Sequence, residues 1–545
     1  MAEGRPGEPT ETSSRRPLMI LAVLPALAGI VLVLVLALFG SENQLMAALK
    51  DDGYYYLVIA RNIATGHGAT FDGLGPTNGF HPLWAMFLTP LFIGDPESLF
   101  GPVRVMIVLA LALHLGAALV IRQAVGRFAD SGTATITALL YAGNPLALYL
   151  VVSGMESPVV ALTVAMLAAA SIRLQQGDLK IDKLSDALLV GVLCGLCMLT
   201  RTEMILLVGL VLTQAVLWPV AGTVRAWSGR LRGGLVAGFA ALVVVGPWLG
   251  WNLWRFGSVI QVSAQAHRLV AESLRGVSRA DGQTGFAGIG SRLLTIHRES
   301  LSQRLPLPGE LVVVMEVAML ALVVWWFVAV MSPNEPRRQF LDRLRWLAAP
   351  VLYAGGFVAA SFLILGNFRS WYAAGPLTVA AIFVAVPLGL ALARQQAPRH
   401  GRLASGLISG FYVLGMFALG PIFINEINYE ASKTNCWWEA ADVVALNTAP
   451  GDRVGSFNSG TFGYLSRRQV VNLDCVVNNR ALPYLADKRL PDFVTENGIR
   501  YIIDDPMYVA RYYRAFSEHG WNHYLVAVDT LSRGLYSTRC GETGR

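Results

Sequence analysis

Long apolar segments recur along the whole chain and are separated by short polar stretches. The first, from Pro17 to Phe39, can form a spanning helix, because about 20 apolar residues suffice to cross a bilayer. The later apolar segments lie near residues 82–93, 102–121, 133–152, 157–172, 185–199, 203–220, 233–250, 310–331, 347–366, 371–393 and 403–424. This pattern predicts an α-helical polytopic membrane protein.

The basic loops indicate how many of these segments cross. If every segment crossed from a cytoplasmic N-terminus, the basic loops would face outward, against the positive-inside rule. These loops are 122–127, 173–183, 225–232, 337–345 and 394–402. Segment 82–93 is short and contains Pro82 and Pro90, so we expect a juxtamembrane or re-entrant helix there. Eleven spanning helices then remain, with the N-terminus cytoplasmic and the C-terminus external in an inner (plasma) membrane.

The same pattern predicts three parts. Residues 1–16 are polar and expected to be disordered, and 17–424 form the transmembrane domain with large external loops at 41–101 and 255–309. Residues 425–545 are expected to form a small external α/β domain, because β-like runs alternate there with helical stretches. The β-like runs are 453–457, 469–473, 500–503 and 524–528, and the helical stretches are 437–448, 484–497 and 506–518.

Composition supports the membrane assignment. The chain is 54% hydrophobic and 14% charged, whereas soluble domains carry about 25% charged residues. Basic loops account for the net charge of +7, so we expect no nucleic-acid partner. Cys194 and Cys197 are interpreted as packing residues of an apolar helix, and the sequence does not choose a pair among Cys436, Cys475 and Cys540.

Two adjacent acids, Asp51 and Asp52, follow the first spanning helix and open a segment rich in Tyr, Gly, Asn and His. They could simply be hydrated. Charge at membrane depth is costly and usually retained for function, so a general base beside a second acid is the favoured interpretation. The pair could also bind a divalent cation, and the sequence leaves the need for a metal open. No P-loop or His/Cys metal spacing is present.

Other charged residues are predicted to face the same external side. His81 precedes Pro82, and Glu156 lies between two predicted spans, where its charge would also favour a helix N-terminus. Arg201 and Glu203 are expected to form an ion pair between two helices. Arg369 is an external cation flanked by aromatic residues, and arginine suits bidentate phosphate binding. Acids and cations on one face suit sugar transfer from a lipid phosphate.

The stretch from Asp51 to Trp84 resembles the GT-C class of polytopic glycosyltransferases, in particular the bacterial lipid A aminoarabinose transferases and the protein O-mannosyltransferases. Asp51-Asp52 and the turn 66–68 resemble the acidic opening of their first external loop. His81-Pro82 stands where related enzymes have a Lys-Pro that contacts the lipid phosphate, and Glu156 where they have a second external acid, usually Asp. Arg369 resembles a late basic contact to the same phosphate.

The resemblance implies an inverting glycosyltransferase that moves a sugar from a polyprenyl-phosphate donor to a glycan, lipid or protein acceptor on the external face. Asp51 is the expected base, with Asp52 and Glu156 as further catalytic acids. His81, Arg369 and Arg201 are the expected donor-phosphate contacts. A transporter or flippase of lipid-linked sugars is the alternative; it would need acids within the spanning helices and paired broken helices. A non-catalytic scaffold would leave the acidic opening unexplained.

Overall fold

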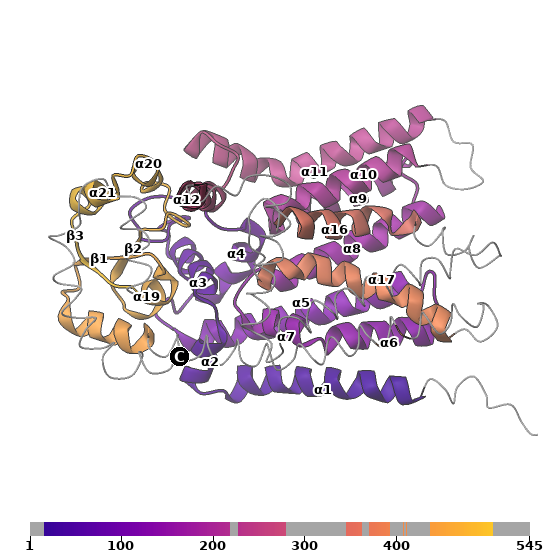
Figure 1. The fold of residues 1–545 in the computed structure, drawn as a ribbon, viewed down its shortest axis with the longest axis horizontal. Coiled ribbons are helices and arrows are strands. Elements are labelled where there is room, and N and C mark those ends of the chain that lie inside the picture. The colour runs from indigo at the N-terminus through magenta and orange to yellow at the C-terminus, as the bar shows by residue number, and fades with distance from the viewer. Residues whose placement is uncertain are drawn as a thin grey trace, which may run out of the picture.

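A computed structural model of the chain describes residues 16–218, 227–279, 345–361, 370–392, 407, 410 and 437–504. A bundle of roughly parallel helices lies beside a small α/β region, and short helices fill the space between them (Figure 1). The fold is therefore mostly helical, with apolar helices on one side and a mixed region on the other.

The bundle contains helices of uneven length. Its elements are α1 (Arg16–Phe39), α5 (Phe100–Val125), α6 (Ser131–Ala142), α7 (Pro145–Val152), α8 (Ser157–Gln176), α9 (Leu184–Thr200), η2 (Thr202–Met204), α10 (Ile205–Leu217), α11 (Trp227–Phe256), α16 (Ala348–Ala360), η4 (Ser370–Ala373) and α17 (Ala374–Leu392). Among the described residues, four of these helices are long and apolar enough to cross a membrane alone, or five if α6 and α7 count as one span. The predicted number of eleven stays a prediction.

The predicted span 133–152 is broken in the middle, where α6 and α7 meet at an angle of 49°. Two residues explain the break. A Cβ at Gly143 would lie 2.6 Å from the backbone N of Ala26, so α1 passes too close for a side chain. The Asn144 side chain then caps α7 by accepting from the N–H groups of Leu146 and Ala147, just before Pro145.

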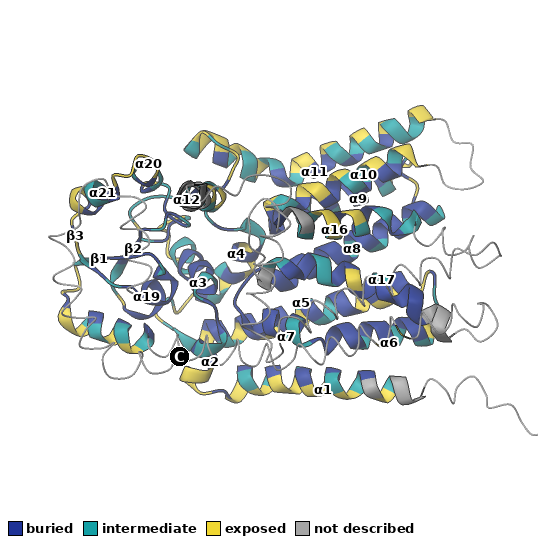
Figure 2. Cartoon of the chain, viewed as in Figure 1, coloured by how far each residue is buried: buried dark blue, intermediate teal, exposed yellow. Residues whose placement is uncertain are grey.

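The outer faces of the bundle are apolar and exposed. Leu32 and Phe39 of α1, and Leu235 and Phe239 of α11, are each more than 60% exposed. Figure 2 shows these exposed faces along both helices at the edges of the bundle, with buried residues between them. An apolar exterior of this extent fits hydrocarbon rather than water, so the chain is a multi-pass membrane protein.

Short helices connect the bundle to the α/β region. They are α2 (Glu42–Ala48), α3 (Asp51–Ala64), α4 (Pro82–Leu88), η1 (Thr89–Phe92) and α12 (Val262–Arg279). The segment 82–93, set apart above because of its two prolines, forms α4 and η1 and has no long helix. α3 lies at the centre of this layer, with Gly53 through Ala60 all buried.

The α/β region has a parallel three-stranded sheet in the order β2-β1-β3. Its elements are β1 (Arg453–Ser456), α19 (Ser459–Leu465), β2 (Gln469–Asn472), α20 (Leu482–Ala486), α21 (Leu490–Glu496) and β3 (Ile499–Ile502), preceded by helical residues 437–447. Asp504, just after β3, accepts hydrogen bonds from the backbone N–H groups of Phe457 and Asn458 at 2.7 Å. The carboxyl ends of β1 and β3 are thus joined where α19 begins.

Several predicted features lie outside the described residues. They are the disordered N-terminus up to residue 15, spans 310–331 and 403–424 apart from residues 407 and 410, the second half of loop 255–309, the strand 524–528 and the helix 506–518. Among the cysteines, Cys436 and Cys540 also lie outside. Cys194, Cys197 and Cys475 are buried free thiols.

Candidate active site

Helix α3 places the two acids between the bundle and the α/β region. Asp51 and Asp52 occupy its first turn, where negative charge favours the helix dipole. The N–H of Lys50 donates to the carbonyl of Ser153 at 3.0 Å. A Cβ on Gly53 would lie 2.6 Å from that same carbonyl oxygen, so a glycine is required for this close approach.

One side of α3 faces the α/β region. Residues four apart share a helix face, so Asp51 and Tyr55 point the same way. One carboxylate oxygen of Asp51 accepts from the N–H and the hydroxyl of Thr461, both at 2.8 Å, and the other accepts from the N–H of Gly460 at 3.2 Å. The Tyr55 hydroxyl accepts from the N–H of Ser459 at 3.3 Å. Asp51 therefore caps the N-terminus of α19 from another part of the chain.

A third acid, Asp474, belongs to the same site. Burial raises the pKa of Asp474 to about 8; hydrogen bonds from the Val476 N–H and from Asn472 oppose this shift, and the charges of Asp52 and Asp51 add to it. The loop after β2 holds Asp474 in place through the Val476 N–H, at 2.9 Å, and the next residue, Cys475, has a positive φ of 66°. Burial therefore favours the neutral form of the Asp474 side chain, which is electrostatically coupled to the two acids of α3.

The other side of α3 faces a buried ionic cluster. Tyr56, four residues after Asp52, donates its hydroxyl to Oε2 of Glu156 at 2.8 Å. Glu156 is completely buried, and its Oε1 accepts from Arg201, which also donates to Glu203. The predicted Arg201–Glu203 ion pair is confirmed, and Glu156 joins it as a second carboxylate partner.

Arg201 has a further neighbour that fixes its orientation. Its guanidinium lies over the ring of Tyr372, 4.8 Å from the centroid. Burial lowers the pKa of Arg201, but the charges of Glu203 and Glu156 outweigh this and raise it above its usual value. Arg201 therefore stays charged, and it already has two carboxylate partners.

His81 lies at the edge of the same cluster, with its Nε2 3.8 Å from Oε1 of Glu156. Burial and the nearby charge of Arg201 lower the pKa of His81 to about 3, against an opposing contribution from Glu203. Gln261 donates to the carbonyl of Phe80 at 2.6 Å and lies 3.4 Å from Nδ1 of His81. If Nδ1 accepts from Gln261, the His81 proton sits on Nε2. His81 is neutral at pH 7 and can contribute a hydrogen bond but not a positive charge.

The predicted site residues thus fall into two groups joined by α3. His81, Glu156 and Arg201 form one cluster, and Asp51 and Asp52 lie at the start of α3 beside the α/β region. Arg369 lies outside the described residues. Among the described residues, no three His, Cys, Asp or Glu side chains are arranged to hold a metal ion.

Sequence reasoning missed Asp474, Tyr56 and Gln261. Tyr56 could have been found, because it stands one helical turn after Asp52. Asp474 and Gln261 carried no such signal, since only the tertiary fold brings them to α3 and His81.

The chain has the fold of the GT-C membrane glycosyltransferases, so the predicted resemblance is confirmed at the level of fold. The oligosaccharyltransferase of Archaeoglobus fulgidus, tethered to an acceptor peptide, is similar with a TM-score of 0.52 at 15% identity, over 92% of this chain and 70% of that one. The same enzyme with Zn and sulfate gives a TM-score of 0.50 at 16% identity, over 94% and 70%.

Other comparisons are weaker or more local. ArnT from Cupriavidus metallidurans in the apo state aligns with a TM-score of 0.45 at 16% identity, over 90% of this chain and 94% of that one. Residues 423–538 match a family described as Domain of unknown function (DUF8728). Among curated proteins, none matches the chain.

Proposed function

We propose that this protein is an inverting glycosyltransferase that moves a sugar from a polyprenyl-phosphate donor to an acceptor on the external face of the membrane. The acceptor hydroxyl attacks the anomeric carbon as the bond to the lipid phosphate breaks. A carboxylate takes the hydroxyl proton, and the lipid phosphate leaves. The acceptor class stays open among glycan, lipid and protein; the Archaeoglobus enzyme of the same fold was solved with an acceptor peptide.

The observation that carries the proposal is the position of the acids. Asp51 and Asp52 lie where the apolar bundle meets the α/β region, and Asp474 of that region is electrostatically coupled to both. A lipid-linked donor reaches such a site from the bilayer, and a polar acceptor reaches it from water. A flippase would instead need acids along a path through the bundle, and these acids lie at one end of it.

Asp52 is the better base of the pair. Both oxygens of Asp51 accept hydrogen bonds from α19, which stabilise its charged form and weaken it as a base. Asp52 shares a helix face with Tyr56 and is electrostatically coupled to Asp474. Burial favours the neutral form of Asp474, which reduces the negative charge beside Asp52. We assign Asp51 to positioning.

The donor phosphate requires a cation. His81 can donate one N–H but carries no charge, and the charge of Arg201 is already paired with two carboxylates. Arg369 is therefore the main proposed contact to the donor phosphate. Lys50 is a further cation next to the acids; it is buried, with its ammonium 5.2 Å from the ring centroid of Tyr149. Glu156 acts as a positioning residue, because it holds Tyr56 and Arg201 and lies beside His81.

The external orientation rests on charge. Phe100, at the start of α5, stacks on Trp438 of the α/β region at 5.9 Å, so α5 ends at the opposite side of the bundle. The basic residues that follow α5 and α8 gather at that opposite side, which the positive-inside rule assigns to the cytoplasm. The acids then face outward.

Two measurements test the function. Mass spectrometry of lipid-linked sugars and envelope glycans, with and without the protein, identifies the donor as the species that accumulates in its absence. The purified full chain with that donor should then produce glycosylated acceptor and free lipid phosphate. If instead it moves the donor across vesicles without releasing lipid phosphate, it is a flippase and the proposal is wrong.

A further inference from the structure

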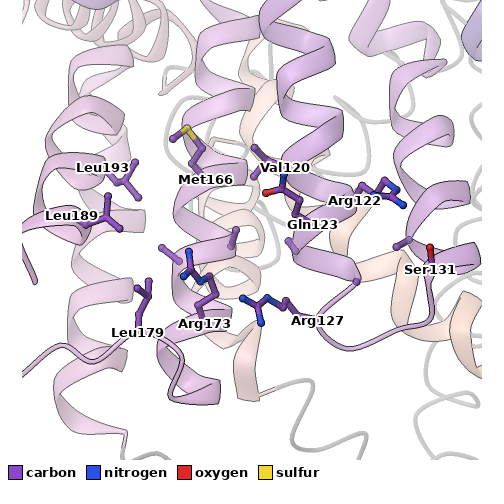
Figure 3. A pocket seen from close by; sticks show the side chains of 15 residues that line it. Val120, Arg122, Gln123, Arg127, Ser131, Met166, Arg173, Leu179, Leu189 and Leu193 are labelled. Atoms are coloured by element: carbon purple, nitrogen blue, oxygen red, sulfur yellow. The ribbon is translucent and has the colours of Figure 1, made fainter. Parts of the chain in front are cut away.

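A cavity of about 640 Å³ lies at the end of the bundle opposite the acids, between the last turns of α5 and α8 and the start of α9. It is lined by both basic and apolar side chains. Figure 3 shows Arg127 and Arg173 reaching toward the same space, with Leu179, Leu189 and Leu193 on the other side of it. This volume lies within the range of small-ligand sites, about 300–1,000 Å³.

The charges in the cavity are only partly neutralised. Arg127 pairs with Asp178 at 2.7 Å, and both side chains are 41% exposed. The Nε of Arg173 is buried and has no hydrogen-bond partner among the described residues. The nearby Lys183 and Asp186 pair with each other at 3.5 Å, and the Asp130 carboxylate accepts from the backbone of α6. Arg127 and Arg173 both line the cavity, and their positive charges favour an anion within it.

The remaining wall is apolar and continuous with the lipid-facing surface. Leu189 lines the cavity and is 45% exposed, and its neighbours on α9, Leu184 and Leu188, are 63% and 43% exposed. A small anion would bind the arginines but would leave the leucine side chains of the cavity exposed to water. A ligand with a phosphate and an acyl chain would satisfy both the arginines and the leucines.

The cavity is too far from the acids of α3 to bind the donor phosphate of the proposed reaction. α5 has 26 residues, so its two ends are separated by about 39 Å at a rise of about 1.5 Å per residue. The cavity therefore lies on the other side of the bilayer from the acids. Basic pockets between helices on the cytoplasmic side are typical sites for anionic lipid headgroups.

We propose that this cavity binds the phosphate headgroup of an anionic phospholipid from the cytoplasmic leaflet, with Arg127 and Arg173 on the phosphate and one acyl chain along Leu189 and Leu193. The site is separate from the acids of α3.

Native mass spectrometry of the purified full chain tests this proposal with phosphatidylglycerol and phosphatidylcholine as probes. The wild type should retain phosphatidylglycerol over phosphatidylcholine, and Arg173→Gln should weaken that retention roughly tenfold, the loss typical of one charge-assisted hydrogen bond. Gln123→Trp, at an exposed position that lines the cavity, should weaken it by filling the space without changing charge. Arg232→Gln is the matched control: an exposed arginine near the start of α11, outside the cavity lining.

Equal retention of the two lipids by the wild type would overturn the proposal. So would equal losses in Arg173→Gln and Arg232→Gln, because these would indicate bulk charge rather than a site. Two competitors identify the source of the phosphate. Displacement of phosphatidylglycerol by millimolar inorganic phosphate would assign the cavity to a free anion, and displacement by equimolar polyprenyl phosphate would assign it to the carrier lipid. Either result would contradict a phospholipid site.

Discussion

The two sides of helix α3 differ in the residues that they contact. On one side, Asp51 and Tyr55 accept hydrogen bonds from the backbone at the N-terminus of α19. On the other side, Tyr56 donates to Glu156, which pairs with Arg201 inside a buried cluster. Asp51 is hydrogen-bonded to α19, and both Asp51 and Asp52 are electrostatically coupled to Asp474 of the α/β region. The comparison indicates that Asp51 attaches the α/β region to the bundle, and we propose Asp52 as the base.

The largest expected effect follows from replacing the proposed base. Asp52→Asn keeps the size of the side chain but cannot accept the acceptor proton, and the loss of a general base costs about 10²–10⁴-fold in rate. Single-turnover transfer from the lipid-linked donor measures this. Donor affinity, measured in parallel, should change little. A rate within threefold of wild type would remove Asp52 from the chemistry.

The buried cluster should respond strongly to loss of its cation. Arg201→Met leaves Glu156 and Glu203 without their shared partner, and breaking a buried ion pair typically costs about 3–5 kcal/mol. Thermal unfolding in detergent should show the loss.

The double variant Arg201→Met/Glu156→Gln should recover part of that stability, because one unpaired buried charge is removed. Arg489→Gln, in the exposed pair with Asp492, is the control and should unfold like wild type. No recovery in the double variant would show that Glu156 and Arg201 are not coupled.

A methyl group at the contact between α19 and α3 should separate the two regions. A Cβ at Gly460 would lie 2.0 Å from the backbone oxygen of Asp51, so Gly460→Ala forces α19 to move. Overpacking of this kind costs about 1–3 kcal/mol, and limited proteolysis of the α/β region should be faster. Gly451→Ala is the matched control, because its Cβ would meet nothing within 4 Å. Equal proteolysis of the two variants would mean that this contact does not hold the regions together.

The smallest effect concerns pH. The pKa of Asp474 is about 8 in the folded protein, above its ordinary value of 3.8. Between these values the folded state binds the extra proton, so this group's contribution to stability is complete below about pH 4 and is lost as the pH rises through 8. The unfolding temperature of Asp474→Asn should therefore fall less steeply between pH 5 and 9 than that of the wild type. A steeper decline in the variant would reverse the assigned shift.

Residue patterns predicted much of this arrangement, because helices and their ends depend on local sequence. The apolar runs, the shortness of the helix in segment 82–93 and the pairing of Arg201 with Glu203 could all be recognised within a few residues. The partners of Asp51 could not, since Gly460 and Thr461 lie about 410 positions away in the chain. Asp474 could not be predicted for the same reason, because it is also far from Asp51 and Asp52 in the sequence. The lowered pKa of His81 follows from burial, which only the folded chain creates.

Amide hydrogen exchange at Gly460 and Thr461 tests the difference between the two sides of α3 most directly. The N–H groups of both residues donate to Asp51. Asp51→Asn weakens these charge-assisted hydrogen bonds and should speed exchange at both amides. Asp52→Asn should leave exchange at the wild-type rate while slowing transfer by about 10²–10⁴-fold. Faster exchange in Asp52→Asn, or wild-type protection in Asp51→Asn, would contradict the separate roles of the two acids.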